Sequence, residues 1–157
     1  MNRAPHAFTF VEAAVVVVIV GLLAVIVVPR FAGAGEDNRA FKAAEDLQQI
    51  AGSFDRFRAS NGYWPPEIGP GQMPPEMRSA FRDFNPFAQP TPIGGLFDYD
   101  NAKEEGAVII AIKSAPGVAV PNVDHARAID AMLDDGDLRT GNFRAMSDGY
   151  AFAFNRK

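Results

Sequence analysis

Residues 8–28 read FTFVEAAVVVVIVGLLAVIVV, an apolar run whose single charged side chain is Glu12. A helix of this length spans roughly 30 Å, about the thickness of the hydrocarbon core of a bilayer. A charge within a membrane segment costs at least about 2.5 kcal/mol, so Glu12 should face a partner rather than lipid. The pattern predicts a transmembrane helix over 8–29. The alternative for Glu12 is a hydrated position in the interface.

A cut between Ala7 and Phe8 would supply the positive partner, because it creates an α-amino group on Phe8. The short leader, the motif FTFVE and the apolar run together resemble the class III signal of type IV pilins and type II secretion pseudopilins. Gly21 and Pro29 stand at the offsets where that family has residues that weaken the helix. The family has Gly before the cut, whereas this chain has Ala7, the next smallest residue.

The resemblance implies a processing route and a role in assembly. A prepilin peptidase would remove residues 1–7 as a leader and N-methylate Phe8. Glu12 would then pair with the Phe8 ammonium of a neighbouring subunit in a filament of pilin-like subunits, built on an inner-membrane assembly platform. Opposite charges attract far more strongly in lipid than in water, so this pair would set the register. The segment between Gly21 and Pro29 would be able to unwind as subunits pack.

The expected location is the inner membrane, as a single-pass protein with a cytoplasmic N-terminus, and then a periplasmic or cell-surface filament. Two alternatives stay open. The small residues AGA at 32–34 fit an ordinary signal peptidase site, and a cut there would release a soluble chain beginning at Gly35. Alternatively, the protein is a monomeric membrane-anchored periplasmic domain that binds a ligand or partner and never polymerises.

Composition narrows the function of the 157-residue chain. Its net charge is −4 and it has no Lys/Arg cluster, which argues against nucleic-acid binding. It has no Cys, which excludes a disulfide, a thiol nucleophile and a Cys-ligated zinc site. Many type IV pilins have a C-terminal disulfide, so this absence favours the pseudopilin side of the family. No catalytic motif is present, and His125 is expected to be a solvated helix residue; we therefore predict a protein that is not an enzyme.

From Glu36 to Ser60 apolar side chains recur at steps of three and four, as one face of a helix requires. Asn61 and Gly62 stop the pattern, and Gly62 is suited to cap a helix C-terminus. The sequence therefore predicts one long helix over 8–60, with its second half laid on a globular head that occupies 61–157. The apolar positions of that second half are Phe41, Ala44, Leu47, Ile50, Ala51, Phe54 and Phe57.

The segment 61–95 is a proline-rich loop that holds eight of the twelve prolines. Its aromatic residues could bury and so hold the loop in place. A short helix is predicted over 75–84, with Pro75 at its start. A sugar-binding platform formed by Tyr63 and Trp64 is the functional alternative to packing. The expected aromatic anchors are Trp64, Phe81, Phe84 and Phe87.

The remaining part, 96–157, contains three strand-like stretches. Residues 96–100 alternate, 107–112 form a buried apolar run, and 150–154 alternate again. The first two should form an antiparallel hairpin, and the third should close the sheet. The fold class expected is α+β and pilin-like: a long N-terminal helix packed on a small antiparallel sheet of about three strands.

A helix is predicted over 124–133, with Asn122 or Asp124 as its N-cap. Its inner face should carry Ile129, Met132 and Leu133.

The polar sequence after this helix suggests a metal site. Asp134, Asp135 and Asp137, with Asp148 nearby, offer hard oxygen ligands around a glycine turn, which suits calcium. Some major pseudopilins have a calcium site in their C-terminal loops, so the resemblance supports the idea. The spacing is not that of an EF-hand. The alternative is a solvated turn with Gly136 as the helix C-cap.

Overall fold

The structure is a computed structural model that describes residues 10–82, 84–101 and 107–156; for 20–37 and 156 it describes the backbone alone. The predicted leader and the cleavage site at Ala7 and Phe8 therefore lie outside the described residues. The chain divides into two compact units, Met1–Glu36 and Asp37–Lys157.

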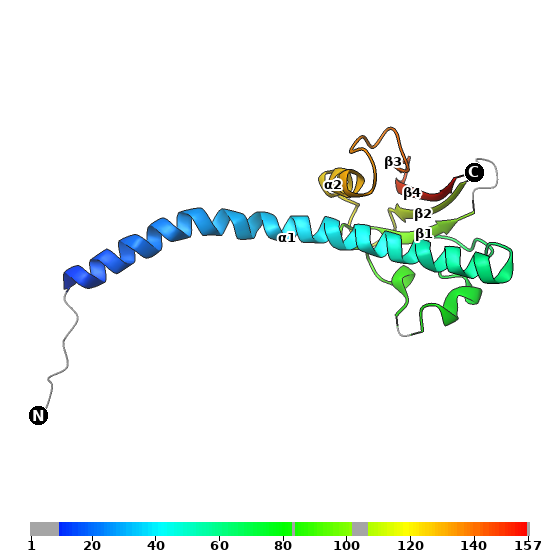
Figure 1. The fold of residues 1–157 in the computed structure, drawn as a ribbon, viewed down its shortest axis with the longest axis horizontal. Coiled ribbons are helices and arrows are strands. Elements are labelled where there is room, and N and C mark those ends of the chain that lie inside the picture. Colours follow the sequence, from blue (N-terminus) through cyan, green and yellow to red (C-terminus); the bar gives the residue numbers. More distant parts are fainter. Residues whose placement is uncertain (1–9, 83, 102–106, 157) are drawn as a thin grey trace, which may run out of the picture. The chain divides into compact units, whose positions relative to one another are not determined.

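The first unit consists of the N-terminal part of helix α1, which spans Phe10–Asn61 (Figure 1). The backbone is helical through Gly21 and Pro29, as the sequence predicts. Side chains from Phe10 to Ile19 are exposed, with Phe10 90% exposed and Val17 70%. In the part of the chain that the structure describes, no helix has the length and apolar character of a membrane crossing. The side chains of 20–37, which include much of the predicted span, lie outside that part.

In the second unit, α1 buries one stripe of side chains and ends where the sequence predicts. Gly62 adopts φ 82°, and its N–H donates to the Arg58 carbonyl at 2.8 Å. Phe41, predicted on the inner face, is 61% exposed. That prediction was wrong because position 41 lies more than a quarter turn around the helix from the centre of the buried stripe. The stripe comprises Ala40, Ala43, Ala44, Leu47, Ile50, Ala51 and Phe54.

The sheet has four antiparallel strands in the order β1-β2-β4-β3. The described residues therefore form an α+β fold, with one strand more than predicted. The extra strand was missed because three residues are too few to show alternation. The strands are β1 Leu96–Asp100, β2 Ala107–Lys113, β3 Phe143–Ala145 and β4 Gly149–Arg156.

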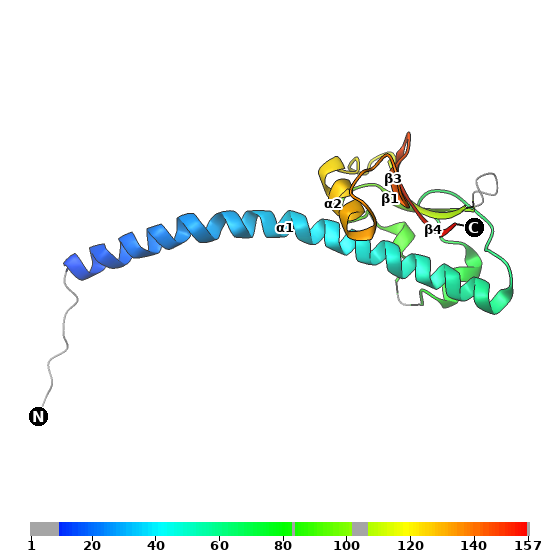
Figure 2. The ribbon, with the colours of Figure 1, turned by 45° about the horizontal axis from the view of Figure 1, so that its top comes forward.

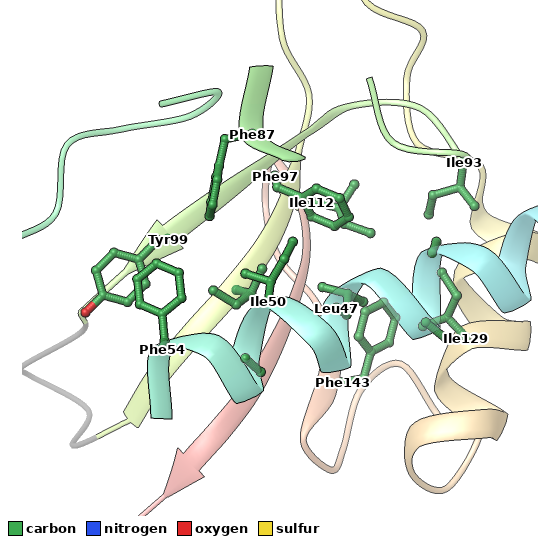
Figure 3. Packing of buried hydrophobic residues seen from close by; sticks show 14 of the residues in the cluster. Leu47, Ile50, Phe54, Phe87, Ile93, Phe97, Tyr99, Ile112, Ile129 and Phe143 are labelled. Carbon is green, nitrogen blue, oxygen red and sulfur yellow. The ribbon is translucent and has the colours of Figure 1, made fainter. Parts of the chain in front are cut away.

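The core lies between α1 and one face of the sheet (Figure 2). Figure 3 shows Leu47, Ile50 and Phe54 of α1 directed at the strands. The Phe54 ring stacks on Tyr99 of β1 with centroids 4.2 Å apart. The outer face carries a separate cluster of mostly small residues: Ala107, Ile109, Ala111, Ala151 and Ala153.

Two short 3-10 helices, η1 Pro75–Ser79 and η2 Pro86–Ala88, interrupt the proline-rich loop. The predicted helix over 75–84 begins at Pro75 but stops at Ser79. Phe81 packs edge-on against Phe87, as expected of anchors, with centroids 6.5 Å apart. Phe84 is 62% exposed, so its predicted role as an anchor was wrong. The short helix ends before it reaches Phe84, and the repeat of the apolar spacing is lost.

Candidate metal site after helix α2

Helix α2, Val123–Leu133, places the first residue of the candidate site. Of the two predicted caps, the Asn122 side chain is the one that caps the helix, by accepting from the N–H groups of Asp124 and His125 at 2.8 and 3.1 Å. The inner face is formed by His125, Ala126, Ile129 and Asp130.

Two sequence predictions for this helix were wrong. His125 is only 7% exposed rather than solvated, since it lies one turn before the buried Ile129 and shares its face. Met132, predicted to face inward, is 47% exposed, because it lies about a quarter turn from the centre of the buried face. The buried face includes Asp130, which the sequence analysis did not identify as a site residue.

The loop that follows α2 fixes the orientation of two carboxylates. Asp134 Oδ2 accepts from the N–H of Asn142. Asp135 Oδ1 accepts from the N–H of Asp137 at 2.8 Å, and its Oδ2 accepts from the Thr140 hydroxyl at 2.8 Å. Each oxygen keeps further lone pairs, so the loop orients both side chains while leaving acceptor capacity.

Gly141 is required for the position of Asp134. It adopts φ +79°, a conformation that side chains with a Cβ rarely take, and a Cβ at this position would overlap the Asp134 carboxylate. The glycine therefore lets the carboxylate reach the backbone of the returning chain.

Three carboxylates converge at the junction of α2 and this loop. One oxygen from each of Asp130, Asp134 and Asp135 lies within 4.8 Å of the others. Asp130 is fully buried, and neither of its oxygens has a hydrogen-bond partner among the described residues. Burial raises the pKa of the Asp130 carboxyl above its usual value, and the negative charges of the neighbouring aspartates, Asp135 first, raise it further.

The other two predicted ligands lie in different surroundings. Asp137 forms a bidentate pair with Arg139, with Nε–Oδ1 and Nη2–Oδ2 distances of 2.9 and 3.0 Å, and this pair lowers the pKa of the Asp137 carboxyl. Asp148 lies in the turn before β4, where its Oδ2 is 3.9 Å from Lys113 Nζ. The structure thus brings Asp134 and Asp135 together with Asp130, and it directs Asp137 and Asp148 toward basic side chains.

The chemistry of this cluster fits calcium. Calcium takes hard oxygen ligands at about 2.3–2.6 Å, so two ligands on opposite sides of the ion are about 5 Å apart. The three carboxylates fall within that span. A bound cation would also supply the positive charge that the buried Asp130 carboxylate needs.

A buried ion pair, which was not predicted, lies on the outer face of the sheet. Asp98 of β1 is 1% exposed, and its Oδ2 accepts from Lys113 Nζ of β2 at 2.8 Å. Burial nevertheless raises the pKa of the Asp98 carboxyl, whereas the bond to Asp98 raises the pKa of Lys113 against the opposing effect of burial. Asp98 stands at a strand position that faces away from the core, where an acidic residue normally indicates exposure to solvent, so the sequence did not reveal its burial.

Tyr63 and Trp64 border an open groove of about 1370 Å³ with Glu67, Asp100 and Arg144 among its walls. The Trp64 ring packs edge-on against Phe154 with centroids 5.8 Å apart, and the Arg58 guanidinium lies 5.0 Å from its centroid. These contacts show that Trp64 packs as an anchor of the loop, as predicted.

The residues predicted for processing and assembly belong to the first unit. Glu12 lies in the first turn of α1 and is exposed. Gly21 and Pro29 are described by helical backbone only, and Ala7 and Phe8 lie outside the described residues.

Comparison with known proteins finds a similarity over part of the chain. A 90-residue part of the chain is 34% identical to the type II secretion system core protein G of Dickeya chrysanthemi. The aligned part covers 53% of this chain and 59% of that protein, so the chain spans less than two thirds of the length of the relative it matches. No family model matches the chain. No solved structure matches it either.

Proposed function

We propose that this chain is a structural subunit of a type II secretion pseudopilus or a related type IV pilus-like filament. The observation that carries the proposal is that two parts of α1 differ in burial. The helix uses 40–54 to pack on its own sheet, whereas 10–19 present exposed apolar side chains and one acid, Glu12. The similarity to a type II secretion core protein supports the same reading.

The exposed segment 10–19 needs an apolar environment. Leaving Phe10 and the following valines in water forgoes roughly 25 cal/mol for each Å² that could be buried. Lipid covers such a segment before assembly, and the helices of neighbouring subunits cover it in a filament. In this proposal the prepilin peptidase removes residues 1–7, and Glu12 pairs with the new α-amino group of Phe8 on a neighbour.

Cross-linking in native cells tests this proposal. Because the chain has no Cys, Val17→Cys, at a position 70% exposed on α1, introduces a single thiol. A thiol-specific bifunctional cross-linker should then yield a ladder of oligomers. Adding Glu12→Gln should remove most of the ladder, because the register charge is lost.

The matched control is Glu45→Gln, which removes another exposed carboxylate of α1, one paired with Lys42 at 3.1 Å in the second unit. It should leave the ladder intact. If the Val17→Cys variant that retains Glu12 yields monomers alone, the result would contradict the filament and favour a membrane-anchored monomeric domain. A full ladder with Glu12→Gln would contradict the role given to Glu12.

We also propose that the acidic loop after α2 binds calcium, with Asp134 and Asp135 as ligands. Their remaining oxygen lone pairs and the oriented loop support this proposal. Millimolar calcium should raise the midpoint of thermal unfolding of the full chain in detergent, since a ligand that binds only the folded state stabilises it. Magnesium should do less, because it gives up its hydration water reluctantly. An unchanged midpoint would count against calcium.

A further inference from the structure

We propose that Asp130 is the buried ligand of this calcium site, so that metal binding fixes α2 on the hydrophobic core. The inference rests on calcium binding at the acidic loop. It adds a ligand from a different element, one that lies outside the loop and was not foreseen from the sequence.

Burial without a partner singles out Asp130. Its side chain is fully buried, and its two oxygens have no hydrogen-bond partner in the described ranges. An ionised carboxylate is among the most costly groups to bury, so a buried one either gains an opposite charge or takes up a proton. Exposed acids need no such compensation, so the burial of Asp130 is an observation independent of the acidic composition of the loop.

The arginines on either side of Asp130 in the sequence have other partners. Arg127 Nη1 lies 3.0 Å from Asp124 Oδ1 on the exposed side of α2. Arg139 is engaged by Asp137 through two hydrogen bonds. The carboxylates of Asp134 and Asp135 lie close to Asp130, and they add negative charge rather than neutralise it.

This arrangement selects a hard divalent cation. Three oxygens within 4.8 Å of one another can surround one hard cation, and calcium accepts an irregular oxygen set more readily than magnesium, which requires a near-ideal octahedron. Zinc prefers nitrogen and sulfur ligands, and the chain has no Cys. Asp130, Asp134 and Asp135 together provide the three carboxylates of a calcium site.

The site joins two segments that are each anchored in the core. The backbone N–H of Asp134 donates to the Asp130 carbonyl at 2.7 Å, so the loop begins on the last turn of α2. Ile129 precedes Asp130, and Phe143 follows the loop at the start of β3; both are fully buried. Figure 3 shows these two side chains beside Leu47 of α1.

The position of Asp130 couples metal binding to the docking of α2 on the core. With the ion held, Asp130 can stay ionised in its buried place, and the inner face of α2 stays on the core. Without the ion, the carboxylate either takes up a proton or moves toward water, and the second course loosens α2 from the core. Metal binding and α2 docking are then two readouts of one equilibrium.

Binding is tested with calcium alone and the full chain in detergent. Calcium should raise the wild-type unfolding midpoint by about 5 to 10 °C. Asp130→Asn keeps the shape of the side chain but removes its charge, and should abolish most of this shift. Asp135→Asn, a change at an exposed position, should weaken the shift as well. Asp137→Asn and Asp148→Asn are the matched controls, and both should keep it.

Coupling is tested by hydrogen exchange. Calcium should slow exchange of the buried-face amides of α2, those of Ile129 and Asp130, by about tenfold or more in the wild type. Amides of β2, at the centre of the sheet, should change less. In Asp130→Asn, calcium should leave α2 exchange unchanged.

The outcomes separate this inference from the proposals on which it rests. No calcium response in the wild type overturns the metal site and this inference together, and leaves the filament proposal to its own cross-linking test. A response kept by Asp130→Asn but lost by Asp135→Asn leaves calcium in the loop and overturns the role of Asp130. Slower exchange confined to the loop overturns the coupling to α2.

Discussion

Two aspartates of the head are buried, and they differ in whether a cation compensates their negative charge. Asp98 has Lys113 at 2.8 Å from one oxygen, whereas the described residues offer Asp130 no cation in contact. Both stand where sequence patterns predict solvent-facing polar residues, so their burial was not foreseen. Periodicity shows which face a residue occupies, but it does not show whether a loop covers that face.

Replacing Lys113 with Met should lower the free energy of unfolding, because the buried Asp98 carboxylate loses its cation. Removing one partner of a buried pair costs about 3–5 kcal/mol, whereas the double variant Lys113→Met/Asp98→Asn should recover most of that loss. Urea unfolding measures both values. A loss below about 1 kcal/mol would mean that Asp98 is well hydrated.

The same pair predicts a pH dependence with a definite sign. The folded pKa of Asp98 is raised by burial, so its contribution to stability is full below the ordinary value near 3.8 and is lost as pH rises through the folded pKa. Lys113 opposes this rise, so Lys113→Met should raise that pKa further. The destabilisation by Lys113→Met should therefore be smaller at pH 4 than at pH 7. An equal loss at both values would contradict it.

Gly141 and Gly117 form a matched pair for testing the close approach of Asp134. Both adopt positive φ, at +79° and +77°, but a Cβ at 117 meets no atom within 4 Å, whereas one at 141 overlaps the Asp134 carboxylate. Ala at either position costs about 1 kcal/mol for the backbone. Gly141→Ala should cost at least about 1 kcal/mol more in urea unfolding and should also reduce the calcium response. Equal costs would show that Asp134 can move aside freely.

Among the elements, the head half of α1 should contribute most to stability. Phe54 is fully buried between Tyr99 and Phe87, with ring centroids at 4.2 and 6.3 Å. Phe54→Ala should lower the free energy of unfolding by about 3–5 kcal/mol. Phe41→Ala, on the exposed side of the same helix, should change it by less than about 0.5 kcal/mol. A large effect at Phe41 in the isolated protein would contradict its exposure.

Long periodic elements could be predicted from the sequence, and short ones could not. The bounds of β1 and the cap of α2 at Asn122 follow from alternation and from side-chain chemistry, and both are confirmed. Strand β3 and helix η2 have three residues each, too few to show a period. The carboxylate cluster was predicted in part, because Asp134 and Asp135 are adjacent in sequence. Asp130 joins them only through the last turn of α2.

At the scale of the whole molecule, the head and the N-terminal segment obey different constraints. The second unit satisfies its own core, with α1, α2 and the sheet closing around Leu47 and Phe54. The first unit presents exposed apolar side chains from Phe10 to Ile19. Under the filament proposal, lipid and then the helices of neighbouring subunits would cover these side chains.

The mature N-terminus of the protein from native membranes is the decisive whole-molecule measurement. Intact mass and N-terminal peptide sequencing should find a chain that begins at Phe8 and carries one added methyl group, because removal of residues 1–7 creates the ammonium that Glu12 would pair with. Ala7→Gly should be processed at least as fast, and a bulky Ala7→Leu should accumulate uncut. A chain beginning at Gly35 would mean a released soluble protein and would refute the filament. An uncut chain beginning at Met1 would leave a membrane-anchored domain as the better account, since an anchor needs neither the cut nor the charge.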